Sequence, residues 1–266
     1  MKLGVLGTGN MAGAIIGGVL GKKVLSSSQI IGFDVDRGKL AAVRRTFKIR
    51  GAASAREVCK KADVVLLAVK PQDLPALLTE VKAEVKNQLW LSIAAGIDIK
   101  TLKKYLGAKA KIIRLMPNTP AMLGLGATAF TAGANCSARD KKTTLKIFGA
   151  VGDVLEMKSE SKLDAVTGLS GSGPAYVYAF IGALIRAGIE QGLGGASSRR
   201  LALQTVLGAT TLMNNSRKNA EELISIVASK KGTTEAGLKV LRQKGFEKIV
   251  RQCVKKATER ARQLRK

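Results

Sequence analysis

The chain has 266 residues, of which 46% are hydrophobic, with a formal net charge of +26, three cysteines and no histidine. This length and composition suit a soluble globular protein built as one large domain or two modest ones. The absence of histidine excludes the commonest general acid–base and the commonest metal ligand. No cysteine spacing indicates a zinc site or a disulfide framework. We therefore expect no metal site, and cysteines that are free thiols in a reducing cytoplasm.

The first predicted element is a strand at Lys2–Leu6, followed at once by a GxGxxA turn that opens an apolar helical pattern. In this context Gly7 allows a tight turn, Gly9 lets a pyrophosphate approach the backbone, and Ala12 permits close packing of helix on strand. A second strand, Gln29–Phe33, ends at an acidic residue of the kind that contacts an adenosine ribose. The predicted cofactor contacts of these two turns are Leu6, Gly7, Thr8, Gly9, Asn10, Met11, Ala12, Asp34 and Arg37.

Three further apolar runs read as parallel strands, at Val64–Val69, Leu89–Ile93 and Lys111–Met116, with helical spacing at Pro75–Lys86 and Ile99–Tyr105 between them. Ligands of open α/β sheets bind beyond the carboxyl ends of the strands, so the turns that follow these runs share one candidate edge. The cofactor contacts predicted there are Ala68, Val69, Lys70, Pro71, Ala95, Gly96 and Asn118.

Strand signals stop near Asp164, and we place a domain boundary at residue 162, with an α/β domain over 1–162 and an all-helical domain over 163–266. The glycine- and serine-rich Gly168–Tyr176 predicts a loop before a helix, at a junction able to hold an anion. The apolar run Ala175–Leu184 is too short and too close to charges to span a bilayer, so no membrane segment is expected. The predicted helices are Tyr176–Leu193, Ser197–Asn215, Glu221–Ser229, Thr233–Lys244 and Gly245–Leu264.

The helix at 176–193 carries apolar residues on nearly every side, which predicts burial on all sides. A domain of about 100 residues offers few neighbours to cover such a helix, so we expect a second copy of the chain to complete this core.

The motifs at Gly7–Ala12, Ala68–Pro71, Met116–Pro120, Asp164–Tyr176 and Gly232–Thr234 together closely resemble those of pyrroline-5-carboxylate reductases. The resemblance covers nearly the whole chain. It implies an N-terminal Rossmann-type domain and a C-terminal all-α dimerisation domain, a homodimer often assembled into a decamer, and hydride transfer from NADPH, or from NADH, to the cyclic imine 1-pyrroline-5-carboxylate to give L-proline.

The same resemblance implies the substrate site. Gly232, Thr233 and Thr234 would bind the substrate carboxylate at a helix N-terminus, Thr234 would act as proton donor, and Glu160 would lie near the substrate ring. The family's usual Ser-Pro-Gly-Gly-Thr-Thr reads Ser-Lys-Lys-Gly-Thr-Thr here, so Lys230 and Lys231 replace a proline and a glycine.

Three alternatives remain open. A dehydrogenase of the β-hydroxyacid type would need a catalytic lysine early in the second domain, and Gly168–Tyr176 contains none. The +26 charge favours polyanions in general, but no aromatic-rich motif indicates a nucleic-acid partner, and a solvated basic face is the better interpretation. A dinucleotide-binding relative without turnover is the third.

Overall fold

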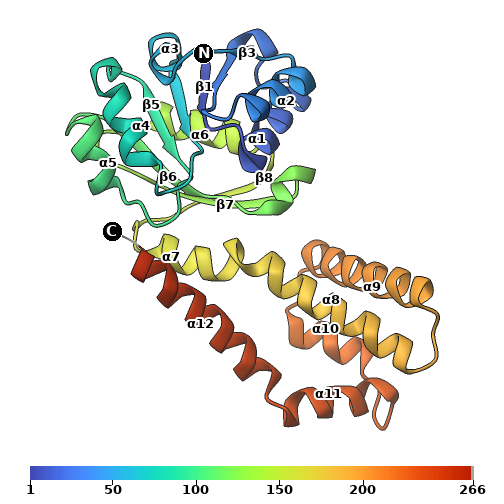
Figure 1. Ribbon diagram of the computed structural model, residues 1–266. Coiled ribbons are helices and arrows are strands. Elements are labelled where there is room, and N and C mark those ends of the chain that lie inside the picture. Colours follow the sequence, from blue (N-terminus) through green and yellow to red (C-terminus); the bar gives the residue numbers. More distant parts are fainter. Residues whose placement is uncertain (265–266) are drawn as a thin grey trace. The chain divides into compact units, whose positions relative to one another are not determined.

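One eight-stranded sheet organises the N-terminal part of the chain in the computed structural model, which describes residues 1–264 (Figure 1). The strand order is β3-β2-β1-β4-β5-β6-β7-β8, and all neighbours are parallel except β6 and β7. The order reverses between β1 and β4, which is where open α/β sheets bind ligands. The strands are β1 (Leu3–Leu6), β2 (Ile30–Phe33), β3 (Arg50–Gly51), β4 (Val64–Leu67), β5 (Leu89–Ser92), β6 (Lys111–Met116), β7 (Gly126–Ala132) and β8 (Gly152–Glu156).

Helices cover both faces of this sheet, because alternate strand residues point to opposite sides. Leu3 and Val5 pack under α1 (Asn10–Gly21), α2 (Arg37–Phe47) and α6 (Ala138–Phe148). Leu6 and Trp90 pack on the other face, under α3 (Ala55–Lys61), α4 (Leu74–Val81) and α5 (Ile99–Leu106). The short helices are η1 (Ser27–Gln29), η2 (Lys82–Glu84) and η3 (Thr119–Leu123).

The predicted loop at the start of Gly168–Tyr176 is wrong, because this segment is helical. α7 (Lys162–Val166) continues into a π-turn, η4 (Thr167–Gly171), and then into α8 (Gly173–Glu190). The amide of Ser172 donates to the Thr167 carbonyl at 2.8 Å, the five-residue spacing of a π-helix. A proline cannot donate to the carbonyl four residues earlier and its ring crowds that carbonyl, so the wider turn accommodates Pro174 inside a helical run.

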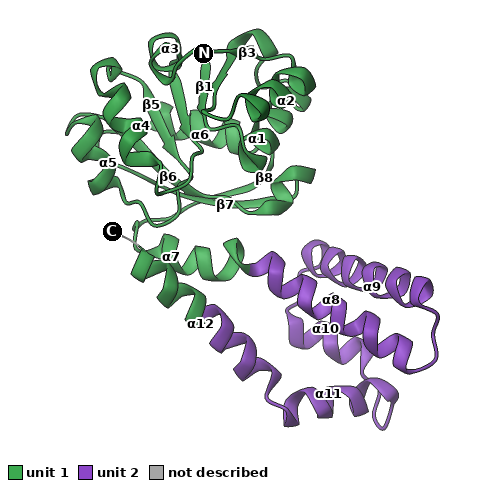
Figure 2. Cartoon of the chain, in the orientation of Figure 1, with its two compact units in different colours: residues 1–172, 255–266 green, residues 173–254 purple. Residues whose placement is uncertain are grey.

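Gly173–Val254 forms a second compact unit made only of helices (Figure 2). It contains α8, α9 (Gly195–Asn215), α10 (Ala220–Val227), α11 (Thr233–Gln243) and the first part of α12 (Phe246–Leu264). The rings of Phe180 and Phe246 lie in a tilted arrangement with centroids 6.3 Å apart. Within Gly173–Val254, all of it described, only Ser198 and Ala202 are buried. This unit therefore has almost no core of its own within one chain.

The helical run that ends in α8 is apolar enough to resemble a membrane span. By length and composition alone, the run Lys162–Glu190 could cross a membrane, and 6% of its most apolar window is buried. The apolar run Ala175–Leu184 was predicted to be too short to span a bilayer, and in the structure it belongs to a longer helical run that continues through the π-turn. One such helix is weak evidence for a membrane.

Among the described residues, the first unit comprises 1–172 and 255–264, so the predicted boundary at residue 162 lies inside it. Leu163 of α7 is fully buried against Met116 and Ala129 of the sheet, which places α7 with the α/β unit. The end of α12 also returns to this unit, where Thr258 and Ala261 are buried. The predicted class, a Rossmann-type domain followed by a helical domain, is confirmed.

Candidate functional site

The β1–α1 turn has the geometry of a phosphate-binding turn. Gly7 has φ +89°, and a Cβ there would lie 2.6 Å from the Ala68 carbonyl oxygen, so only glycine fits. Around Gly9 there is open space, and Gly9 is the N-cap of α1 with no side-chain capping hydrogen bond. The first amides of α1 are therefore left for an anion, and the helix dipole favours one.

Asp34 holds this turn from the end of β2. Its Oδ2 accepts hydrogen bonds from the amide of Thr8 at 2.6 Å and from the Thr8 hydroxyl at 3.1 Å, and its Oδ1 accepts from the amide of Asp36 at 2.9 Å. Thr8 itself is buried. Asp34 was predicted as a ribose contact, and in the structure its Oδ2 binds Thr8 of the glycine turn while its Oδ1 binds the amide of Asp36.

Asp36 caps the next helix. Its Oδ1 accepts from the amides of Gly38 and Lys39 at 2.9 and 3.1 Å, and its Oδ2 lies 3.4 Å from the Lys39 ammonium. These partners, above all the hydrogen bond from the Lys39 amide, hold the pKa of Asp36 below its usual value. Arg37 is the first residue of α2 and follows Asp36 directly. Acidic and basic side chains therefore lie close together after β2, where the adenosine ribose is expected.

The predicted turns after β4 and β5 meet the glycine turn at one sheet edge. The amide of Ala68 donates to the Leu6 carbonyl at 2.8 Å, and the amide of Ile93 donates to the Leu67 carbonyl at 3.2 Å. The turn Lys70–Pro71 then closes with Asp73 donating to the Lys70 carbonyl at 3.0 Å. Ala68–Pro71 thus lies directly beside Gly7, as the strand order requires.

Gly96 meets the end of the chain. It has φ +75°, and a Cβ there would lie 2.6 Å from the Leu264 carbonyl oxygen at the end of α12. The need for glycine at this position therefore comes from packing against α12. No local sequence signal reveals this contact, because it joins residues far apart in the chain.

Asn118 connects the sheet to the π-turn. Its Nδ2 donates to the Ser170 carbonyl at 3.1 Å, and its Oδ1 accepts from the amide of Ala127 at 2.8 Å. Pro174 has no amide hydrogen to offer the Ser170 carbonyl four residues earlier, and Asn118 supplies a donor instead. Asn118 was predicted to contact the cofactor, and the structure gives its amide these structural partners.

Glu160 pairs with a buried arginine. Its Oε1 accepts from Arg114 Nη1 at 3.1 Å and from the amide of Ile99, the first residue of α5, at 2.9 Å. Arg114 is 1% exposed, and removing one partner of such a pair typically costs about 3–5 kcal/mol. Arg114 was not predicted as a site residue, because it lies inside an apolar strand whose pattern is that of the core.

The predicted substrate segment opens α11 in the second unit. Gly232 is the N-cap, without a side-chain capping bond, and Thr233 and Thr234 are the first helical residues. The amide of Gly232 donates to the Ser229 carbonyl at 3.0 Å, which closes a β-turn through Lys230 and Lys231. An uncapped helix N-terminus with hydroxyls beside it suits a carboxylate.

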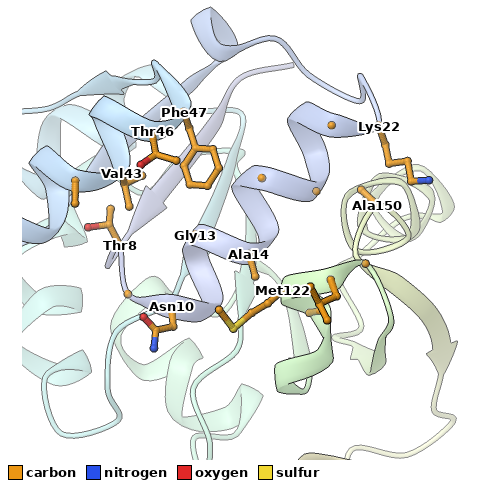
Figure 3. Close-up of a pocket in the computed structure, with 18 of the residues that line it drawn as sticks. Thr8, Asn10, Gly13, Ala14, Lys22, Val43, Thr46, Phe47, Met122 and Ala150 are labelled. Atoms are coloured by element: carbon orange, nitrogen blue, oxygen red, sulfur yellow. The ribbon is translucent and has the colours of Figure 1, made fainter. Parts of the chain in front are cut away.

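A cavity of about 810 Å³ starts at the glycine turn and follows the flank of α1 (Figure 3). Three predicted cofactor residues, Thr8, Gly9 and Asn10, line its beginning. Phe47 of α2 borders it on one side of α1, and Met122 and Ala150 border it on the other. Its size is within the range of small-molecule and cofactor sites. Among the described residues, no group of three side chains suits a metal ion.

Comparison with known proteins identifies the family. A family model described as pyrroline-5-carboxylate reductase dimerisation matches residues 160–264, and the pyrroline-5-carboxylate reductase of Pseudomonas aeruginosa is 38% identical over 264 residues, covering 99% of this chain and 96% of its own. The chain belongs to the pyrroline-5-carboxylate reductase family. The resemblance inferred from the motifs is confirmed.

Further matches agree with this membership in the pyrroline-5-carboxylate reductase family. A second model, described as NADP oxidoreductase coenzyme F420-dependent, matches residues 2–96. A Coxiella burnetii pyrroline-5-carboxylate reductase structure is 31% identical with a TM-score of 0.94, covering 100% of this chain and 98% of that one. A Plasmodium falciparum pyrroline carboxylate reductase structure with NADP bound is 30% identical with a TM-score of 0.91, covering the same shares.

The Asp34 contacts generate a prediction for this member of the family. Asp34→Ala removes the two hydrogen bonds that hold Thr8 in the glycine turn and a third from the Asp36 amide, so we expect NADH and NADPH to lose affinity together, by about 1–3 kcal/mol each. Thr8→Val keeps the amide bond and removes only the hydroxyl bond, so its loss should be smaller. Titration of the quenching of Trp90, the single tryptophan, measures both affinities. If Asp34→Ala instead bound NADH more weakly and NADPH more tightly, Asp34 would be shown to contact the ribose.

Proposed function

We propose that this chain reduces 1-pyrroline-5-carboxylate to L-proline with NADPH or NADH, the last step of proline biosynthesis. The observation that carries the proposal is similarity over the full length, through the α/β unit and the helical unit alike, to proteins named for this reaction. The alternatives of a nucleic-acid-binding protein or a dehydrogenase of another type would not require the specific segments of both units.

The first unit would hold the cofactor. The amides at the start of α1 and the open space at Gly9 fit a pyrophosphate, and the turns at Ala68–Pro71, Ala95–Gly96 and Asn118 border the same edge. When bound there, the nicotinamide supplies the hydride. The protein's part is to bind and orient the cofactor at the sheet edge where the strand order reverses.

The second unit would hold the substrate carboxylate. The amides of Thr233 and Thr234 are donors at the N-terminus of α11, whose dipole favours an anion, and the N-cap Gly232 holds them in place while its own amide closes the preceding turn. The Thr234 hydroxyl would donate a hydrogen bond to the neutral imine nitrogen and pass it a proton, which solvent returns to the hydroxyl, so that hydride adds to the carbon of the protonated imine and the proton stays on the product amine. A protonated imine accepts hydride without a strong acid, which agrees with a chain that contains no histidine.

Glu160 would supply the acidic group near the substrate ring. Its Oε1 is held by Arg114 and by the amide of Ile99, so its orientation is fixed by the α/β unit. Both partners are donors on one carboxylate oxygen, and the other oxygen remains for a ligand.

The working form would be a homodimer, and a homodecamer assembled from such dimers is the larger assembly that family membership suggests. The dimerisation model covers residues 160–264, and the second unit exposes many large apolar side chains in the single chain. Monomeric proteins rarely expose contiguous apolar surface on this scale. A partner that covers α8 and α9 also accounts for the apolar run Lys162–Glu190 without a membrane, so we place the protein in the cytoplasm.

Loss of the Thr234 hydroxyl should lower catalysis. Thr234→Ala removes a hydrogen bond to the substrate, and we expect kcat/KM for pyrroline-5-carboxylate to fall by a factor that corresponds to a loss of about 1–3 kcal/mol in transition-state binding. Thr234→Ser keeps the hydroxyl and should retain most of the activity. The absorbance change on NADPH oxidation measures both. Unchanged efficiency in Thr234→Ala would remove Thr234 from its assigned role.

Both cofactors should support turnover, with NADPH slightly preferred. Asp34 directs its carboxylate into the glycine turn, and Lys39 pairs with Asp36, while Arg37 adds positive charge for a 2′-phosphate. Competition between the two reduced cofactors measures the preference. A preference for NADH above about a hundredfold, some 2.7 kcal/mol, would show that the acidic residues decide.

Dimer formation should depend on the apolar surface of the second unit. Leu207→Glu places a charge at a leucine of α9 that is 59% exposed in the single chain, and we expect dissociation together with loss of helical structure. Leu155→Glu is the matched control, because Leu155 of β8 is 60% exposed and lies in the first unit. Sedimentation at moderate salt, which screens repulsion between two highly basic subunits, gives the mass. A folded, active wild-type monomer at micromolar concentration would contradict the dimer.

A further inference from the structure

The turn before α11 has a backbone conformation that its residues do not favour. Ser229–Gly232 is a β-turn, and its third residue, Lys231, has φ +60°. The second residue, Lys230, has a negative φ. A turn with negative φ at its second residue and positive φ at its third prefers proline at the second position and glycine at the third. Lysines occupy both positions here, and the turn is nevertheless retained.

Gly232 shows why the turn must keep this shape. A Cβ at Gly232 would collide with the Ser229 hydroxyl and lie 3.0 Å from the Ser229 carbonyl oxygen. The turn is therefore drawn tightly against the start of α11. Any relaxation at Lys231 moves Gly232, and with it the first amides of the helix.

Glu235 accepts the amide hydrogen of the left-handed lysine. The amide of Lys231 donates to Glu235 Oε2 at 2.5 Å. Glu235 lies in the first turn of α11, so its carboxylate reaches back past the N-cap to the turn. The amides of Thr233 and Thr234 keep no side-chain cap and remain directed toward an incoming anion.

We propose that Glu235 is a positioning residue for the substrate carboxylate, because it holds Lys231 in the left-handed conformation and so fixes Gly232–Thr234. The proposal rests on the function proposed above, in which these residues bind the carboxylate. Glu235 thereby takes over a task that a proline and a glycine in the turn would perform through backbone preference alone.

The charges around Glu235 are compatible with an anionic substrate. A carboxylate beside the binding site would repel another carboxylate, but Glu235 shares a hollow of about 390 Å³ with Lys231, Lys239 and Arg242. Three cations offset its charge, so its geometric effect can act without excluding the substrate.

A double-mutant cycle tests the coupling. Glu235→Ala should raise KM for pyrroline-5-carboxylate about tenfold, or 1.4 kcal/mol, with kcat changed by less than about twofold. Glu235→Gln retains an acceptor oxygen and should restore about half of this loss on a logarithmic scale. In a Lys231→Gly background, Glu235→Ala should raise KM by less than about threefold, because glycine adopts positive φ without help.

Two control variants make the same chemical changes elsewhere. Lys48→Gly alters another left-handed lysine, with φ 56° at the C-cap of α2, and should leave the effect of Glu235→Ala unchanged. Glu247→Ala removes an exposed carboxylate from the first turn of α12 and should leave KM unchanged.

Hydrogen exchange provides a readout that does not need turnover. The amide of Lys231 should exchange faster in Glu235→Ala, while the amides of residues 7–12 keep their rates. If wild-type protein reduces no imine, the proposed function fails, yet exchange at Lys231 still tests the hold by Glu235. Unchanged exchange at Lys231, or an effect of Glu235→Ala on KM that is the same with and without the Lys231→Gly substitution, would overturn the proposal.

Discussion

The close approach of Gly7 to the Ala68 carbonyl is the contact on which the N-terminal site depends. It requires a left-handed residue without Cβ, and it brings the end of β1 against the end of β4 where the strand order reverses. The amides of α1 point outward only because this turn is tight. Asp34 then fixes the turn from β2 through Thr8, so three adjacent strands together determine where a pyrophosphate can bind.

Polar side chains extend this order beyond the glycine turn. Glu160 joins β6 to the start of α5 through Arg114, and Asn118 joins β6 and β7 to the π-turn through Ser170. Both residues were predicted as ligand contacts, and both have protein partners in the structure. Those partners leave each residue in one orientation, which is what a group that touches a ligand also requires. Structural and binding roles are therefore compatible at these positions.

Local sequence patterns predicted the buried strands and the glycine turn, whose conformations depend on residues close together in the chain. The apolar runs of β1, β4, β5 and β6 and the glycine turn were found, because burial on both faces and a tight turn each have a composition of their own. The strands β7 and β8 were not predicted, since they are rich in small or polar residues. The π-turn was taken for a loop because glycine, serine and proline usually mark loops. The return of α12 to Gly96 and the direction of the Asp34 carboxylate are tertiary contacts that no local pattern contains.

The replacement of two turn residues by lysines illustrates how a site can keep its shape when its sequence changes. A left-handed lysine costs roughly 1–2 kcal/mol relative to its preferred conformations. The bond from the Lys231 amide to the Glu235 carboxylate acts against that cost, because a hydrogen bond to a charged acceptor is stronger than one between neutral groups. This stabilisation depends on Glu235 as the hydrogen-bond acceptor, and Glu235 lies outside the motif. The proposed role of Glu235 would make a position beyond the Ser-Lys-Lys-Gly-Thr-Thr segment part of the site, since a side chain would then supply what the backbone preferences of glycine and proline supply in the usual motif.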